Sequence, residues 1–239
     1  PQSASPLRIM EVCGTHSMAI ARFGLRAFFP PGVRLISGPG CPVCVTGPGY
    51  VDAALELAGR NLIIATFGDM MRVPGSRMTL AAGRAQGADI RVCYSPGEAL
   101  NLAMDHPDRE VVFLAVGFET TAAPIMGMLA RAVQQQIQNI SLLLSLKGIP
   151  PALSALIQDP EIGVHGFLCP GHVSAIIGAD AYRFVAEEYH IPCVVAGFEA
   201  LDILQAVRNL MRQHRDGVAQ VENLYRRVVR PEGNLKAQA

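Results

Sequence analysis

The chain has 239 residues, and its 20 basic and 20 acidic side chains leave a formal net charge of zero. Half of the residues are hydrophobic, which is enough for one large core or two smaller ones. No basic stripe and no long apolar run is present, so we expect neither a nucleic acid nor a membrane as a partner. Without a signal-peptide pattern, we expect a cytoplasmic protein whose cysteines are free thiols.

Short β-branched apolar runs alternate along the chain with amphipathic segments. We predict strands over residues 8–13, 34–37, 62–67, 89–94, 110–116, 140–146, 166–169 and 193–196. We predict helices over residues 16–29, 51–60, 76–86, 98–105, 121–138, 151–158, 182–189 and 201–215. Strands that are apolar throughout are typical of parallel sheets, which are covered by helices on both faces.

This alternation predicts an α/β protein with right-handed crossovers. A (β/α)8 barrel is one possibility, but the polar segment 105–110 near the midpoint favours two domains. We expect two Rossmann-like domains, residues 1–106 and 107–216, each with a mostly parallel four-stranded sheet flanked by helices. These domains are expected to face each other across a cleft, and residues 217–239 to form a C-terminal helical segment.

Thiols and an imidazole follow the first two predicted strands, at the sheet edge where parallel α/β proteins bind ligands. Cys13 precedes Gly14 at a predicted helix N-terminus, a position that favours a thiolate. His16 lies three residues further on and suits metal ligation, proton transfer or a plain helix cap. Cys41 and Cys44 form a Cys-x-x-Cys pair, which either cycles between dithiol and disulfide or binds a soft metal.

Further candidates follow other strands: Gly38 and Gly40 in the cysteine loop, Glu119 and Thr120, His172, and Glu199. Each has a plain structural interpretation as well, since glycines shape turns and carboxylates or hydroxyls cap helices. Among the other cysteines, Cys93 and Cys193 lie inside apolar strands and are expected in the core. The role of Cys169, which ends a strand, is open at this point.

Eight short motifs give the sequence a close resemblance to the HypD family of hydrogenase maturation proteins. They are IMEVCGTH (9–16), ISGPGCPVCV (36–45), ATFGDM (65–70), RVPGS (72–76), GFETT (117–121), PGHVS (170–174), VAGFE (195–199) and VRPEGN (229–234). They are spread over nearly the whole chain, so the resemblance is specific.

The resemblance implies a scaffold on which the Fe(CN)2CO unit of [NiFe] hydrogenases is assembled. It implies a HypC-type small chaperone as partner, and HypE as the cyanide donor, itself supplied by HypF. Cys13 matches the cysteine that binds this iron together with a thiolate from the chaperone, and Cys41 with Cys44 matches a redox-active pair.

We therefore assign the site residues as follows: a metal ligand, Cys13; catalytic residues, Cys41, Cys44, His16 and Glu119; cofactor-binding residues, Gly38, Gly40, Thr120, His172 and Glu199. The family also carries a [4Fe-4S] cluster in a C-terminal cysteine-rich region. No cysteine follows Cys193 here, so the ligands of that cluster are absent from this chain.

Two other functions fit the residues. A thiol-disulfide oxidoreductase needs only Cys41 and Cys44 and would act without Cys13 or a partner. A non-catalytic docking platform would use its cysteines structurally, and replacing Cys41 by Ser would leave hydrogenase maturation intact.

Overall fold

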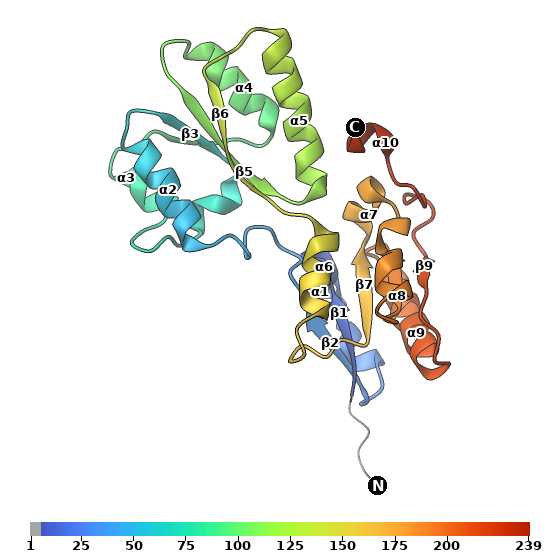
Figure 1. Ribbon diagram of the computed structural model, residues 1–239. Coiled ribbons are helices and arrows are strands. Elements are labelled where there is room, and N and C mark those ends of the chain that lie inside the picture. Colours follow the sequence, from blue (N-terminus) through green and yellow to red (C-terminus); the bar gives the residue numbers. More distant parts are fainter. Residues whose placement is uncertain (1–5) are drawn as a thin grey trace. The chain divides into compact units, whose positions relative to one another are not determined.

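The computed structural model describes residues 6–239, which form two compact units (Figure 1). The terminal unit comprises the described residues up to Cys41 together with Gly148–Ala239, and the middle unit comprises Pro42–Lys147. Each unit contains a parallel sheet flanked by helices. The predicted α/β class is therefore confirmed, whereas the cleft between two domains stays a prediction.

The terminal unit is built on a five-stranded parallel sheet. In spatial order its strands are β2 (Val33–Ser37), β1 (Leu7–Glu11), β7 (Gly166–Pro170), β8 (Cys193–Ala196) and β9 (Val221–Asn223). Its helices are α1 (Gly14–Arg22), η1 (Leu25–Phe28), α6 (Ile149–Ile157), α7 (Gly171–Ile177), η3 (Asp180–Tyr182), α8 (Arg183–Glu187), α9 (Ala200–Arg215) and α10 (Leu235–Gln238). Helices α1 and α9 pack on one face, where Ile20 and Val207 meet strand residues such as Leu168.

The middle unit is built on a four-stranded parallel sheet. In spatial order its strands are β4 (Ile90–Val92), β3 (Ile63–Thr66), β5 (Val111–Gly117) and β6 (Ile140–Leu146). Its helices are α2 (Pro48–Ala58), η2 (Gly68–Arg72), α3 (Leu80–Ala85), α4 (Pro96–Asp105) and α5 (Glu119–Gln134). Helices α2 and α3 lie on one face, and α4 and α5 on the other (Figure 1).

Strand β5 shows why this sheet needs helices on both faces. All seven of its residues are buried, and successive side chains point to opposite faces. Phe113 packs toward the helices α4 and α5, whereas Leu114 packs toward α2 and α3. This strand is therefore apolar throughout because helices cover both faces of its sheet, as the sequence predicted.

The two compact units divide the chain elsewhere than at the boundary expected near residue 106. The first two strands do not share a sheet with the next two. They pair instead with β7 and its neighbours, in the register Ile9↔Gly166. One sheet therefore has five strands, and the middle unit is inserted between β2 and α6.

Two local predictions were also wrong or incomplete. Residues 217–239 were expected to be helical, but Val221–Asn223 is strand β9, paired in parallel with β8. The short helix α7 was not predicted, because its few residues follow β7 directly. The final helix, α10, does lie where the start of a helix was expected.

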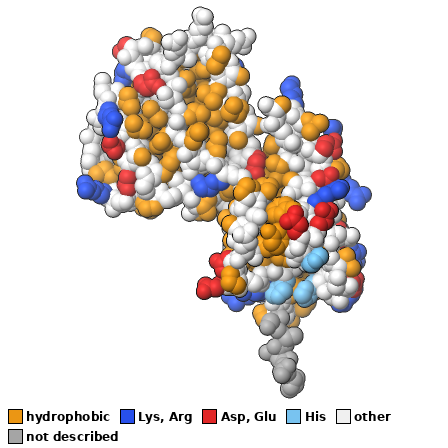
Figure 2. Space-filling model, viewed as in Figure 1, with side chains coloured by type: hydrophobic (Ala, Val, Ile, Leu, Met, Phe, Trp, Pro, Cys, Tyr) orange, Lys and Arg blue, Asp and Glu red, His pale blue; other side chains and the backbone are white. Residues whose placement is uncertain are grey.

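The surface of the middle unit is rich in apolar side chains. Figure 2 shows hydrophobic side chains gathered on the visible face of this unit, over the region where Figure 1 draws β5 and β6. Strand β6 is an edge strand, and Leu144 within it is 63% exposed. Among residues 6–239, no helix is long and apolar enough to cross a membrane.

Candidate thiol and imidazole site

The carboxyl end of β1 is a topological switch point of the terminal sheet. The chain passes from β1 to β2 on one side, and β7 pairs with β1 on the other. Open α/β sheets bind ligands at such points, outside the carboxyl ends of their strands. Cys13 follows β1 and His172 follows β7, so two predicted site residues lie at this position.

Cys13 stands at the N-terminus of helix α1. Its backbone is extended and its carbonyl accepts a hydrogen bond from the Ser17 amide at 3.2 Å. The preceding residue, Val12, is buried and donates its amide to Leu168 in β7, which anchors the strand end. Cys13 itself is partly exposed, so its thiol is placed by rigid elements and accessible to a ligand.

The Gly-Pro-Gly loop after β2 lies directly against Cys13. The Gly14 amide donates to the Gly40 carbonyl at 3.2 Å, and the Gly38 amide donates to the Glu11 carbonyl at 2.9 Å. A Cβ atom on Gly40 would lie 2.5 Å from the Cα of Cys13, closer than real atoms approach. Glycine is therefore required here, and the close approach brings the start of the Cys-x-x-Cys loop beside Cys13.

His16 is fully buried and held by one hydrogen bond. Its Nε2 donates to the Gly197 carbonyl at 2.9 Å, across the sheet edge to the loop after β8. Its other ring nitrogen, Nδ1, has no hydrogen-bond partner within the described residues. The helix-cap interpretation of His16 is therefore wrong, because the ring turns into the interior of the terminal unit.

Burial also sets the charge of His16. Removal from water lowers its pKa from 6.5 to about 4, and the hydrogen bond to Gly197 opposes this only in part. His16 is therefore neutral at pH 7. With Nε2 carrying the proton, the buried Nδ1 keeps its lone pair as an unpaired acceptor.

Phe198 brings the two predicted histidines of the terminal unit together. Its ring centroid lies 4.7 Å from that of His16 and 4.2 Å from that of His172. His16 is buried and His172 is exposed, so the phenyl ring joins the interior imidazole to the one at the surface. The first turns of α1 and α7 and the loop after β8 therefore converge on one aromatic side chain.

Gly197 gives this cluster its rigidity. A Cβ atom at this position would lie 2.1 Å from Oδ2 of Asp202 and 2.8 Å from the Tyr225 ring. Asp202 accepts two hydrogen bonds from Arg227, whose guanidinium also lies 4.5 Å from the Tyr225 ring centroid. The Gly197 carbonyl that accepts from His16 is thus held in place by Asp202 of α9 and by Tyr225 and Arg227 of the loop after β9.

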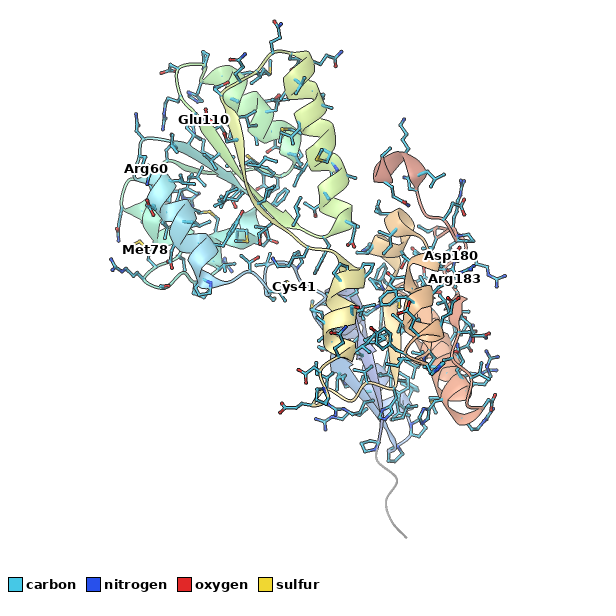
Figure 3. All side chains as sticks on the ribbon, in the orientation of Figure 1. Cys41, Arg60, Met78, Glu110, Asp180 and Arg183 are labelled. Atoms are coloured by element: carbon cyan, nitrogen blue, oxygen red, sulfur yellow. The ribbon has the colours of Figure 1, made fainter. Side chains whose placement is uncertain are left out.

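The cysteine pair lies on the stretch of chain between β2 and α2, and Figure 3 labels Cys41 there. Cys41 is partly exposed and is the last residue of this part of the terminal unit, next to Gly40. Cys44 is exposed and belongs to the middle unit. The two sulfurs of the pair therefore have different surroundings.

The remaining predicted residues lie at helix N-termini. Glu119 and Thr120 begin α5 after β5 in the middle unit, where a carboxylate suits the helix dipole. Glu199 is the exposed N-cap residue of α9 and makes no side-chain capping bond. Their expected functional roles stay predictions.

The other three cysteines are core residues. Cys93 is 2% exposed, and Cys169 and Cys193 are fully buried on the neighbouring strands β7 and β8. Burial raises the pKa of Cys93 to about 11 and that of Cys169 well above its ordinary value. The open question about Cys169 is thereby answered in favour of packing.

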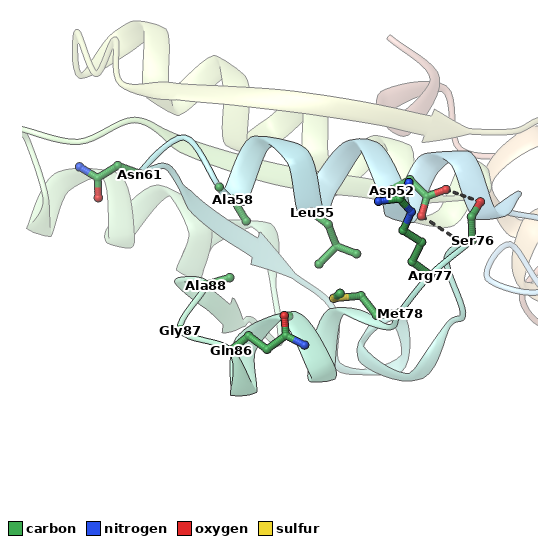
Figure 4. Close-up of a pocket in the computed structure, with 12 residues that line it drawn as sticks. Asp52, Leu55, Ala58, Asn61, Ser76, Arg77, Met78, Gln86, Gly87 and Ala88 are labelled. Atoms are coloured by element: carbon green, nitrogen blue, oxygen red, sulfur yellow. Dashed lines mark hydrogen bonds between the residues drawn. The ribbon is translucent and has the colours of Figure 1, made fainter.

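Within residues 6–239, no group of three or more His, Cys, Asp or Glu side chains is close enough to hold a metal ion. A cavity of about 930 Å³ lies between α2 and α3, lined by Leu55 and Met78 among others (Figure 4). Its lining includes no cysteine or histidine, and Asp52 there is bound to Ser76. This cavity is therefore separate from the thiols.

The structure adds functional candidates that the sequence did not suggest. Phe198, Tyr225 and the ion pair of Asp202 with Arg227 were not predicted. The motif containing Gly197 and Phe198 was visible in the sequence, but nothing there showed that its aromatic ring would lie between two histidines.

Together, fold and site define a parallel α/β protein with a thiol and a neutral buried imidazole at the carboxyl edge of its sheet. The chain belongs to the HypD family: residues 1–239 match the family model described as HypD, hydrogenase formation hypA family. The resemblance carried by the short motifs is confirmed.

The chain is also similar to several curated proteins. It is 49% identical over 234 residues to the hydrogenase maturation factor HypD of Escherichia coli K12, covering 98% of this chain and 63% of that protein. It is 47% identical over 230 residues to the protein of the same name from Rhodobacter capsulatus, covering 96% and 61%. It is 48% identical over 239 residues to that from Azotobacter vinelandii, covering 97% and 63%. The chain thus spans less than two thirds of the length of these relatives.

Replacing Gly40 by Ala tests the close approach to Cys13. The added methyl group overlaps the Cys13 backbone, so we expect the free energy of unfolding in urea to fall by about 1–3 kcal/mol. The matched control is Gly32→Ala in the same unit, where a Cβ meets nothing within 4 Å and the change should stay within about 0.5 kcal/mol. Equal effects of the two substitutions would contradict the close approach.

The pH dependence of stability tests the burial of His16. Its pKa is lower in the folded than in the unfolded chain, so stability is complete above pH 6.5 and is lost as the pH falls toward 4. We expect the burial of His16 to make the free energy of unfolding about 2 kcal/mol lower at pH 5 than at pH 7. His16→Gln should remove that part of the slope in urea unfolding; an unchanged slope would mean that His16 is not buried as a neutral ring.

Replacing Phe198 by Leu tests the link between the histidines. We expect the ring protons of both His16 and His172 to lose the ring-current shift of the phenyl group in NMR spectra, because Phe198 stacks on both. Phe23→Leu is the control, since its ring contacts Arg22 instead. Spectra in which only one histidine responds would contradict the three-ring arrangement.

Proposed function

We propose that this chain takes part in hydrogenase maturation, as a scaffold on which the Fe(CN)2CO unit of [NiFe] hydrogenases is assembled. Its family membership and relatives that are themselves named hydrogenase maturation factors support this proposal. The observation that carries it is the position of Cys13 at the switch point of the terminal sheet, three residues before a buried neutral imidazole. The iron is the substrate of this scaffold, built up while bound and then passed on.

Cys13 binds the iron in this proposal. Iron with cyanide and carbonyl ligands is well matched to soft thiolate donors. The thiol is partly exposed at a fixed strand end, so a partner can approach it. A HypC-type small chaperone supplies a second thiolate, and the iron is held between the two proteins.

In this proposal His16 acts as a neutral ring of fixed orientation and not as a charged group. Its proton is committed to Gly197 through Nε2, so the ring has one tautomer and a fixed direction. The Nδ1 lone pair is then the one acceptor that the buried ring keeps. His172, Gly38 and Gly40 shape the same carboxyl edge.

Cys41 and Cys44 serve as the electron store. When a dithiol closes to a disulfide it releases two electrons and two protons, which are available while diatomic ligands are installed. Gly40, the residue before Cys41, lies against Cys13, so in this proposal the electrons are delivered on the iron side of the loop. Glu119, Thr120 and Glu199 complete the proposed set at helix N-termini.

The remaining parts of the proposal concern partners. HypE donates cyanide and is supplied by HypF, and neither nucleic acid nor a membrane takes part. The work takes place in the cytoplasm. Electrons reach the cysteine pair from a [4Fe-4S] cluster of the family's C-terminal cysteine-rich region, whose ligands are not in this sequence.

A second candidate function is a thiol-disulfide oxidoreductase. The exposure of Cys44 favours it, because an accessible sulfur can exchange with external disulfides. An insulin-reduction assay separates the two functions. The oxidoreductase turns over insulin with or without Cys13, whereas the scaffold reacts only stoichiometrically through its cysteine pair.

Replacing Cys13 by Ala tests the iron-binding role. In complexes purified anaerobically with the small chaperone, we expect both the iron content and the infrared bands of bound cyanide and carbon monoxide to disappear, because the protein thiolate is lost. Cys93→Ala, at a buried core position, is the control and should keep the bands. Bands of unchanged intensity in the Cys13 variant would sink the assignment.

A further inference from the structure

The outer edge of the terminal sheet carries a cavity that has no part in the proposed iron chemistry. Strand β9 forms this edge and, among the described strands, pairs only with β8 (Figure 1). A cavity of about 700 Å³ lies between β9 and helix α8, within the size range of ligand sites. Its lining also includes Val229, Arg230 and Pro231 of the motif VRPEGN, to which the proposed function gives no role.

The pairing with β8 leaves part of the β9 backbone free. The Cys193 amide of β8 donates to the Gln220 carbonyl at 3.2 Å. Successive residues of a strand turn their N–H and C=O groups to opposite sides, so Val221 and Asn223 turn theirs away from β8. An exposed row of such groups is a template on which another chain can pair.

The side chains of these two residues face the cavity. Glu222, which lies between them, accepts hydrogen bonds from three side chains of α9, the helix on one face of the sheet. Because side chains alternate along a strand, Val221 and Asn223 point to the opposite face, where they line the cavity together with Ala186 of α8. The cavity is therefore a groove that has an edge strand as one wall and a helix as the other.

Hydrogen bonds and a glycine fix the end of this groove. The Ala179 amide donates to the Arg230 carbonyl at 3.1 Å, and the Asp180 amide donates to the Pro231 carbonyl at 3.0 Å. Gly178 has a φ of 87°, and a Cβ atom there would lie 2.1 Å from the Pro231 carbonyl oxygen. The loop that carries VRPEGN is thus held in place before a ligand binds, which lowers the entropy lost on binding.

The groove carries positive charge. Its charged lining residues are three arginines and two acids: Arg183, Arg226, Arg230, Asp180 and Glu187. Arg183 donates to Asp180 at 3.0 Å, and Figure 3 labels both residues. Within the described residues, Arg226 and Arg230 form no ion pair, so both guanidinium groups are available to an anion.

Arg226 holds one of these charges at the backbone of the edge strand. Its Nε donates to the outward-facing carbonyl of Asn223 at 3.2 Å. The two terminal nitrogens of the guanidinium remain for a ligand, and a guanidinium binds a carboxylate through charge-assisted hydrogen bonds. A carboxylate bound to Arg226 therefore lies along the outward edge of β9.

We propose that this groove binds an extended acidic segment of a partner protein, which adds to the sheet as a sixth strand beside β9. A peptide main chain carries donors and acceptors at the spacing that Val221 and Asn223 present, whereas a small anion does not. Arg226 and Arg230 bind acidic side chains of the segment, and its small apolar side chains contact Ala186. This inference does not depend on the proposed role in hydrogenase maturation.

Fluorescence polarisation with synthetic peptides tests the class of ligand. The probe is a short labelled peptide that alternates valine with aspartate and has both ends capped. We expect saturable binding that weakens as salt is added. A peptide with lysine in place of aspartate, and one methylated at every backbone nitrogen, should each bind at least about tenfold more weakly. No binding of the acidic peptide at millimolar concentration would overturn the inference, as would equal binding of the methylated peptide, which would show that the arginines hold an anion only.

Variants of the edge strand test the place of binding. Val221→Pro removes an N–H group that points outward and leaves the hydrogen bonds to β8 intact. We expect this variant to fold, as checked by thermal unfolding, and to bind the acidic peptide at least about tenfold more weakly. Unchanged affinity in the folded variant would overturn the inference.

Arginine variants give an independent test, which also decides the matter if Val221→Pro does not fold. Arg226→Gln and Arg230→Gln should each weaken binding of the acidic peptide several-fold, because each removes a charge-assisted hydrogen bond. Arg208→Gln, at an exposed position on α9, is the control and should bind as the parent chain does. Equal affinities of all three variants would mean that the acidic peptide does not bind in this groove.

Discussion

The parallel pairing of β1 with β7 is the constraint on which the rest of the site depends. It joins Ile9 to Gly166 across most of the chain and makes β1 an interior strand of the terminal sheet. The end of an interior strand is flanked by the loops of both neighbours. Cys13 therefore has the Gly40 loop on one side and the start of α7, which carries His172, on the other.

The site is built at some cost in stability. The ring of His16 is removed from water, and only one of its two nitrogens is paired. The backbone of Gly40 approaches Cys13 so closely that no side chain fits. Residues whose local arrangement lowers the stability of the fold are common at functional positions. Here the result is that the His16 ring and the Cys13 thiol are both held in fixed positions at one edge of the sheet.

Much of the fold was predictable from the sequence because it is local. The run 111–116 is apolar throughout, and a strand of this kind has to be buried on both faces. The sheet to which each strand belongs was not predictable, because the pairing Ile9↔Gly166 leaves no trace near either residue. The short strand Val221–Asn223 was missed for the same reason, since it is defined by its pairing with β8.

The candidate site, too, was only partly predictable from the sequence. Cys13, His16 and the Cys-x-x-Cys loop were predictable, since reactive residue types stood next to glycines after apolar runs. The partner of His16 was not, because a backbone carbonyl 181 residues away has no sequence signature. Phe198 lies in VAGFE, one of the motifs that stand out in the sequence, but only the convergence of α1, α7 and the loop after β8 places its ring between two imidazoles.

In the proposed function the thiols have two separate tasks: Cys13 would hold the iron, and the pair of Cys41 and Cys44 would store electrons without holding it. X-ray absorption at the iron edge, on the chain purified with its small chaperone, tests this most directly because it counts sulfur ligands. We predict two sulfur ligands, one from each protein, staying at two in Cys44→Ser, whereas Cys13→Ser should purify without iron. A count that falls in Cys44→Ser and is unchanged in Cys13→Ser would contradict the account.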